Sequence, residues 1–136
     1  MQDSEQASID RLIAAFFDAF DNRDGRIPDR DSLARMFAGQ AIIAMHHGED
    51  CVLCTPAEFI EPRMALLTNG ELVGFHEWEE SATTQLMGSL ALRSSRYAKS
   101  GFRDGTGVAG TGTKFFQLAR LPSGWRIVAL SWIDDA

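Results

Sequence analysis

The stretch FFQLARLPSGWRIVALSW, residues 115–132, is typical of two strands joined by a tight turn. Side chains alternate on both sides of Pro122-Ser123-Gly124, and a Gly-bearing turn between alternating segments indicates a β-hairpin. The pattern extends over roughly 107–121 and 125–133, and similar segments occupy roughly 73–86 and 88–99. The sequence therefore predicts a four-strand antiparallel meander in the second half of the chain.

Helical patterns precede these strands. Apolar residues at positions 9, 12, 13, 16, 17 and 20 recur every three or four residues, which predicts an amphipathic helix from Ser8 that ends near Gly25. A short helix is expected over 33–38 and a strand over 41–45. Thr55-Pro56-Ala57-Glu58 is a capping box, so a third helix should run to about Asn69. Helices followed by strands predict an α+β fold, a single domain over residues 1–136.

Composition limits the classes of partner. The formal net charge is −6, and the thirteen basic residues are scattered, whereas a nucleic-acid-binding protein carries a basic stripe. We therefore expect no nucleic-acid partner and no membrane partner. The acidic first ten residues do not resemble a signal peptide, which favours a cytoplasmic location. Two cysteines three positions apart cannot link distant elements, so disulfides are not expected to hold the fold.

The segment HHGEDCVLC, residues 46–54, gathers potential metal ligands. A structural zinc site needs four ligands, but CVLC supplies two and no second ligand pair follows. Cys54 precedes a helix N-terminus, which can lower a thiol pKa, but the βαβ setting of a thioredoxin-like site is missing. The segment is therefore expected to be a polar loop with ordinary thiols, and the sequence predicts no metal and no cofactor.

Both faces of the predicted hairpin are apolar. Phe115, Gln117 and Ala119 alternate with Phe116 and Leu118. Because the helices can cover only one sheet face, the second apolar face indicates a subunit interface. The face with Phe116, Leu118 and Ile127 is expected to lie outside, and a homodimer is predicted to form through it.

Together, MFAGQAIIAM (36–45), FHEWE (75–79) and FFQLARLPSGWRIVALSW resemble the nuclear transport factor 2-like superfamily, especially its small bacterial polyketide-cyclase-like (SnoaL-like) members. The resemblance covers nearly the whole chain. It implies a cone-shaped, cystatin-like α+β barrel, in which three N-terminal helices pack in a strongly curved antiparallel sheet. It also implies a pocket at the open end and, commonly, dimers through the sheet.

Steroid-isomerase relatives within that superfamily allow a comparison of chemistry. Their tyrosine donor corresponds to Phe16, their general-base aspartate to Met45, and their second oxyanion donor to Gln117. That chemistry needs a base within reach of the substrate and a donor for the enolate. This chain keeps at most the donor, so activity of that type is not expected.

Two residues are candidate catalytic bases. The resemblance and strand alternation place His47 on the pocket face, although it equally fits an exposed histidine where the strand ends. Glu77 would have a raised pKa if it faced an apolar cavity, but an edge strand can also carry such charges against aggregation. Arg93 and Tyr97 share a strand face and are either carboxylate anchors or surface or dimer residues. The predicted ligand pocket comprises Phe16, Phe20, Met45, Gln117, Leu130 and Trp132.

The leading functional hypothesis is a dimeric domain with a pocket for a small, largely apolar molecule. A rival is a lyase, isomerase or cyclase that uses His47 or Glu77 as base and Gln117 as donor. A third alternative is a protein-interaction module that uses the sheet face.

Overall fold

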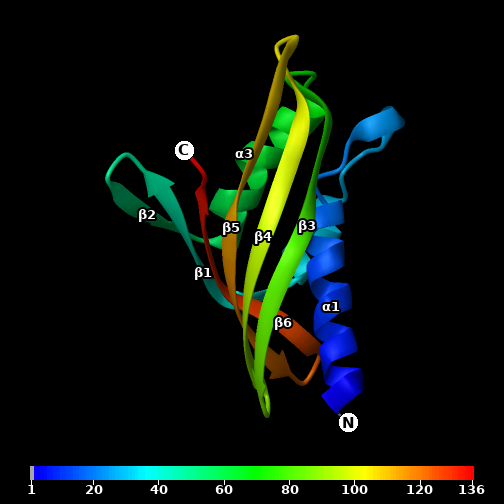
Figure 1. Cartoon of the computed structure of the whole chain (residues 1–136). Helices are drawn as coiled ribbons and strands as arrows, with labels where there is room; N and C mark the ends of the chain where they lie inside the picture. The colour runs from blue at the N-terminus through cyan, green and yellow to red at the C-terminus, as the bar shows by residue number, and fades with distance from the viewer. Residues whose placement is uncertain (1) are drawn as a thin grey trace.

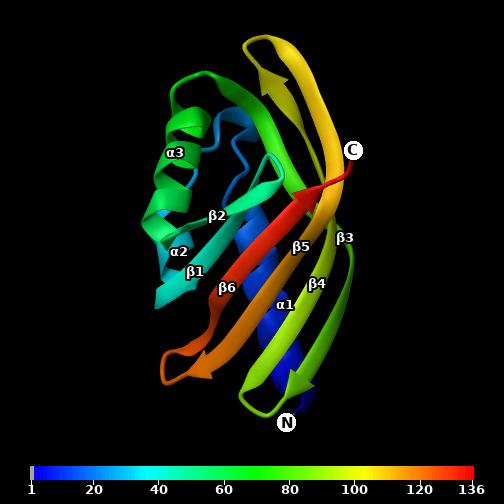
Figure 2. The same cartoon turned by 90° about the vertical axis from the view of Figure 1, so that its left-hand side faces the viewer.

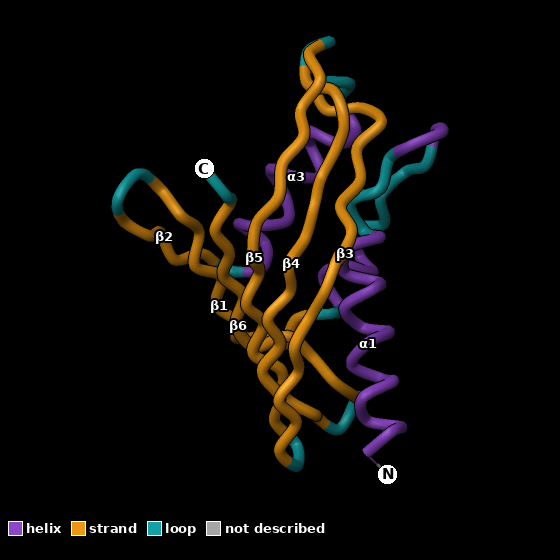
Figure 3. The backbone as a smooth tube through the Cα atoms, in the orientation of Figure 1, coloured by secondary structure: helices purple, strands orange, loops and turns teal. Residues whose placement is uncertain are grey.

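The computed structural model describes residues 2–136, with side chains from Glu5 onward. The helical elements are α1 (Gln2–Asp18), a short 3-10 helix η1 (Arg23–Gly25), α2 (Arg30–Arg35) and α3 (Pro56–Thr68). The strands are β1 (Phe37–His47), β2 (Asp50–Cys54), β3 (Leu72–Met87), β4 (Leu90–Arg103), β5 (Thr106–Leu121) and β6 (Gly124–Asp134). The predicted order of helices and then a strand meander is confirmed (Figure 3).

The strands form one six-stranded sheet in the order β2-β1-β6-β5-β4-β3. Neighbouring strands are antiparallel except β1 and β6, which pair in parallel, so the sheet is mixed rather than wholly antiparallel as predicted. The helices lie on one side of this sheet: in Figure 2, where the strands are spread across the view, α1 runs behind them and α3 lies beside β1 and β2. This is an α+β architecture with one covered and one open sheet face.

The turn between β4 and β5 has the geometry of a tight hairpin. Asp104 and Gly105 join β4 to β5 with φ of 51° and 81°. Positive φ at both central residues is the geometry of a type I′ turn, whose twist matches that of the flanking strands. The turn lies within the glycine-bearing segment 100–107, where the sequence predicted a connection.

Residues 46–54 form a hairpin rather than the predicted polar loop. β1 continues to His47, and β2 pairs back along it with Ile43 opposite Cys54 (Figure 1). Cys51 is exposed, whereas the Cys54 Sγ lies 3.2 Å from the sulfur of Met45. Burial raises the pKa of the Cys54 thiol. The position of Cys54 just before the N-terminus of α3 therefore does not produce a reactive thiolate.

The helix boundaries follow their caps. The predicted capping box of α3 is confirmed: the Glu58 backbone N–H donates to the Thr55 hydroxyl, and the Thr55 N–H donates to the Glu58 carboxylate. α2 begins earlier than predicted because Asp29 caps it by accepting from the Ser32 N–H at 3.0 Å. It ends at Arg35, and the chain enters β1 at Phe37.

Asn22 joins the segment after α1 to the rest of the domain. Its side-chain amide donates to the carbonyls of Leu67 and Leu72, at 2.9 and 2.7 Å, and its oxygen accepts from the Phe75 N–H at 2.7 Å. Because one side chain satisfies backbone groups at the end of α3 and the start of β3, it fixes the distance between them. α3 is thereby held above the sheet.

The face assignment predicted for β5 and β6 is wrong for several residues. Phe116, Leu118 and Ile127 are fully buried beneath the helices, whereas Gln117 and Phe115 lie on the open face. A register shift between Gln117 and Leu118 in the pairing with β6 lets both Ile127 and Leu130 point into the core. In β5 the alternation is correct and the inner face belongs to the other set of residues, whereas in β6 the register shift breaks the alternation.

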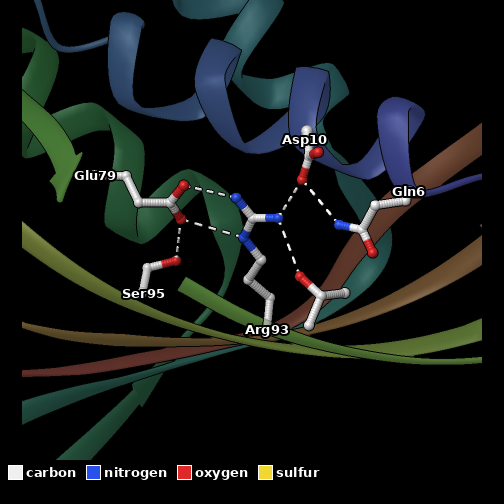
Figure 4. A network of polar contacts seen from close by, with 6 residues as sticks. Gln6, Asp10, Glu79, Arg93 and Ser95 are labelled. Carbon is white, nitrogen blue, oxygen red and sulfur yellow. Dashed lines mark hydrogen bonds and ion pairs between the residues drawn. The ribbon is translucent and has the colours of Figure 1, made fainter. Parts of the chain in front are cut away.

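A buried arginine links α1 to the sheet (Figure 4). The Arg93 guanidinium donates a hydrogen bond to Asp10 of α1 at 2.6 Å. It also donates two hydrogen bonds to the Glu79 carboxylate, at 2.6 and 3.2 Å. The Ser95 hydroxyl donates to Glu79 as well. Arg93 was predicted to be either a carboxylate anchor or a surface or dimer residue. It does bind carboxylates, but these belong to the protein, so Arg93 positions α1 rather than a ligand.

No helix in residues 2–136 is long and apolar enough to cross a membrane.

Candidate functional site

A cavity of about 370 Å³ lies between α3 and the covered face of the sheet. Pro62, Arg63, Leu66 and Leu67 of α3 form one wall, and the opposite walls come from β3 to β6. The sheet residues that line it are Leu72, Phe75, Glu77, Lys99, Arg103, Val108, Lys114, Trp132 and Asp134, and Phe20 contributes from the segment after α1. The cavity has the size and the mixture of apolar walls and few polar groups that small-molecule sites show.

A buried ion pair forms part of this wall. Lys114 Nζ lies 3.3 Å from Glu77 Oε1, with 7% of the lysine side chain and 12% of the glutamate side chain exposed. The ammonium also lies 4.1 Å from the centroid of the Tyr97 ring and 5.0 Å from that of Trp132. Burial lowers the pKa of Lys114, and the attraction of Glu77 opposes that change. The contact falls on Glu77 Oε1 and does not have the geometry of a regular hydrogen bond, so the two groups interact mainly as opposite charges.

A second polar group lies where β6 ends. The Tyr97 hydroxyl donates to Asp134, and Lys99 Nζ lies 3.2 Å from the same carboxylate. Burial and the neighbouring carboxylate raise the pKa of Tyr97, so the phenol stays protonated near neutral pH. Burial alone would raise the pKa of Asp134 as well, but the bonds from Tyr97 and Lys99 hold it below the usual value. This carboxylate is therefore ionised and already neutralised by the protein.

Arg63 differs from the other charged residues of the cavity. Its guanidinium lies 4.4 Å from the ring centroid of Phe59 and 5.1 Å from that of Trp132, and its one hydrogen bond among the described residues is a 3.4 Å contact to the Phe59 carbonyl. No carboxylate of residues 5–136 lies within ion-pair distance of it. Burial lowers its pKa, although an arginine remains charged.

The structure brings together some of the predicted site residues. Glu77, Phe20 and Trp132 line the cavity. Phe16 and Leu130 are buried in the core instead. Met45 packs against this core and contacts Cys54. These three residues do not line the cavity.

Two predicted chemical groups lie far from the cavity wall. His47 is exposed at the tip of the β1–β2 hairpin, opposite Asp50, so its position is that of the exposed alternative. Gln117 is on the open sheet face, and the prediction that its amide lines a cavity with Phe16 and Trp132 is wrong. The physical reason is that Lys114 and Phe116, its alternating neighbours, occupy the covered face.

Arg63 and Lys114 were missed from the sequence. Arg63 follows Phe59 by four positions in the third helix, so it shares the helix face that carries the buried phenylalanine. A lone cation on an otherwise apolar helix face was the signal that could have identified it. Residues 5–136 contain no group of three His, Cys, Asp or Glu side chains arranged to hold a metal ion.

An α+β domain with helices on one sheet face and a cavity between the two layers defines the fold class. No family model and no curated protein matches the chain. Solved structures do share its fold. The Kfla4162 protein from Kribbella flavida superposes with a TM-score of 0.82 at 14% identity, over 100% of this chain and 94% of that protein.

Two further similar structures are described as nuclear transport factor 2-like (NTF2-like) proteins. A nuclear transport factor 2-like superfamily protein from Salmonella enterica serovar Typhimurium has a TM-score of 0.78 at 16% identity, over 100% of this chain and 94% of that one. An NTF2-like protein with a cystatin-like fold from Novosphingobium aromaticivorans has a TM-score of 0.70 at 18% identity, over 95% and 80%. The chain thus has an NTF2-like, cystatin-like fold, which by itself assigns no activity.

Proposed function

We propose that this protein binds a small, largely apolar organic molecule in the cavity between α3 and the sheet. The apolar walls from Phe75, Leu66 and Trp132 would hold the body of the ligand, and the charged residues would orient it. In this proposal the cavity corresponds to the open end of the cone that the resemblance implies.

The observation that carries the proposal is the buried pair of Glu77 and Lys114 in the cavity wall. Two charges removed from water cost free energy, and apolar residues of similar size are often as stable or more stable. The pair is therefore poorly explained by stability. Charged groups in a mostly apolar cavity are typical of a site that binds or transforms a ligand.

A neutral bicyclic probe tests the cavity directly. We expect 2-naphthol to bind and to shift the indole NMR signal of Trp132, because that ring forms a cavity wall. Leu66→Trp would fill the cavity and should weaken binding by about tenfold or more, through loss of the space that the probe occupies. Titration followed by NMR measures both effects.

A matched control separates the cavity from the surface. Leu121→Trp adds the same side chain at the far end of β5, outside the cavity, and should leave the affinity unchanged. Unchanged affinity in Leu66→Trp, or no binding to the wild type at millimolar probe, would contradict the proposal.

A second candidate function is proton transfer on the bound molecule. It is favoured by the position of the Glu77 carboxylate in the cavity wall, beside the Lys114 ammonium. Glu77 would accept a proton from a C–H or O–H acid of the ligand, and Lys114 would stabilise the negative charge that remains on the ligand. His47, exposed at the hairpin tip, and Gln117, on the open sheet face, do not line the cavity and so do not take these roles.

The open sheet face supports a homodimer in a form different from the predicted one. Ile42, Ala129, Gln117 and Leu92 lie side by side across four strands, and Phe115 lies in the next row. Ile42, Leu92 and Phe115 are each about half exposed, at 52%, 52% and 49%. These rows contain no charged side chain, so a second copy could meet this patch without like-charge repulsion despite the net charge of −6.

We expect Phe115→Glu to convert the dimer into a monomer, because each interface would have to desolvate two unpaired carboxylates. Sedimentation velocity at micromolar concentration measures the change. Met87→Glu, at the exposed tip of the β3–β4 hairpin, is the control and should remain dimeric. A monomeric wild type would exclude this interface and leave the open face for a different protein partner.

A further inference from the structure

We propose that Arg63 binds a carboxylate of the ligand, so that the cavity selects small organic acids with a flat apolar body over their neutral analogues. This inference rests on the proposed function, because it names the class of molecule that the same cavity accepts.

The first argument is the lack of a protein partner for Arg63. A guanidinium has five N–H donors in a planar fork that matches the two oxygens of a carboxylate. Here it makes one long hydrogen bond to a backbone carbonyl. Glu77 and Asp134 influence it only through longer-range attraction. Most of its donors are therefore free to meet a ligand.

The second argument is the state of the other cavity charges. Glu77 is paired with Lys114, and Asp134 is paired with Tyr97 and Lys99. Both acids of the lining are thus compensated by residues of the protein. The lining holds four cations, Arg63, Lys99, Arg103 and Lys114, against these two acids, although the whole chain has a net charge of −6. This concentration of positive charge favours an anion inside the cavity.

The third argument is the position of the guanidinium over two aromatic rings. Contacts with Phe59 and Trp132 hold the Arg63 plane against the apolar wall while leaving its edge unpaired. Trp132 also lines the cavity. A flat acid could therefore pack against Trp132 while its carboxylate meets the guanidinium, and the anion would offset the cost of burying the arginine charge.

Paired probes of the same shape test the charge preference. We expect 2-naphthoate to bind the wild-type protein about tenfold more tightly than 2-naphthamide, the ratio expected for a hydrogen-bonded charge pair over a neutral contact. Arg63→Gln should remove the preference, and Arg63→Lys should retain part of it. Isothermal titration calorimetry measures the affinities, and far-ultraviolet circular dichroism confirms that each variant is folded.

Arg120→Gln is the matched control. Arg120 lies on β5 outside the cavity, about half of its side chain is exposed and it pairs with Glu5 at 3.0 Å, so its removal should change either affinity by less than about twofold. Equal binding of acid and amide, or a preference that survives in Arg63→Gln, would overturn the inference while binding of 2-naphthol leaves the proposed function standing. If none of the three probes binds, both proposals fail.

Discussion

Replacing Glu77 with glutamine is expected to lower the free energy of unfolding by about 3 kcal/mol, because it leaves Lys114 charged, buried and without its partner. The ammonium would retain its contacts with the Tyr97 and Trp132 rings, which compensate only part of the lost attraction. Urea denaturation at neutral pH measures the change. A loss below about 0.5 kcal/mol, the scale of an exposed pair, would show that water reaches the pair.

The pH dependence of this loss has a definite sign. Burial lowers the pKa of Lys114 below its unfolded value, so between the two pKa values the unfolded chain binds more protons than the folded chain. The free energy of unfolding contributed by this lysine therefore rises with pH up to the unfolded value of about 10.4. The deficit of Glu77→Gln relative to the wild type should be largest near neutrality and shrink in alkaline solution.

A double variant separates the cost of burial from the cost of losing the partner. Glu77→Leu combined with Lys114→Met removes both charges and should restore most of the stability, since apolar replacements of buried pairs are often neutral or stabilising. If the double variant is as stable as the wild type yet no longer binds 2-naphthoate, the pair is kept for the ligand. A double variant as unstable as Glu77→Gln would make the pair a structural requirement.

Features of the fold that depend on neighbouring residues could be predicted from the sequence. The capping box at Thr55 and Glu58 needs only residues three positions apart, and the stripe from Ile9 to Phe20 needs only helical periodicity. The turn at Asp104 and Gly105 depends on local backbone preference. Each of these signals acts within a few residues, so no tertiary information was required.

The choice of the inner sheet face needed tertiary information. Alternation shows that Gln117 and Phe116 point to opposite sides, but both sets of residues around them are largely apolar. The resemblance placed Gln117 at a pocket-donor position, and Lys114 belongs to the opposite set, although a charged residue is seldom buried. It is buried here because Glu77, 37 positions earlier in the chain, lies opposite it across the cavity wall. This assignment reversed the expected roles of Gln117 and Phe116.

A residue of the candidate site could be predicted when the alternation of its own strand was enough to place its side chain. Glu77 follows Phe75 on the same face of β3, and Phe75 is buried. Arg63 comes from a helix whose position over the sheet is fixed by Asn22, through contacts that span 45 and 53 positions of the chain. The sequence pattern alone does not reveal that such a helix residue and Trp132 meet at one cavity.

Replacing Gly112 with alanine is expected to destabilise the protein by about 3 kcal/mol, the range for overpacking a site that cannot relax. A β-carbon there would lie 2.6 Å from the Ile133 carbonyl oxygen and 2.7 Å from the Tyr97 hydroxyl oxygen. Neither atom can move freely, because β5 and β6 are paired along this stretch and the Tyr97 hydroxyl is bonded to Asp134. Thermal denaturation followed by circular dichroism measures the loss.

Gly110→Ala supplies the matched control, two residues earlier on the same face of the same strand. Its β-carbon would meet only the flexible Lys99 side chain, at 3.4 Å, so the variant should be neutral or gain up to about 1 kcal/mol from the reduced entropy of the unfolded chain. Equal losses in both variants would mean that β5 tolerates no added side chain for reasons unrelated to Tyr97. A large loss at Gly112 alone would show that the close packing of Tyr97 against the strand holds Asp134 and Lys99 at the edge of the cavity. In that case the Gly112→Ala protein that remains folded should also bind 2-naphthoate more weakly.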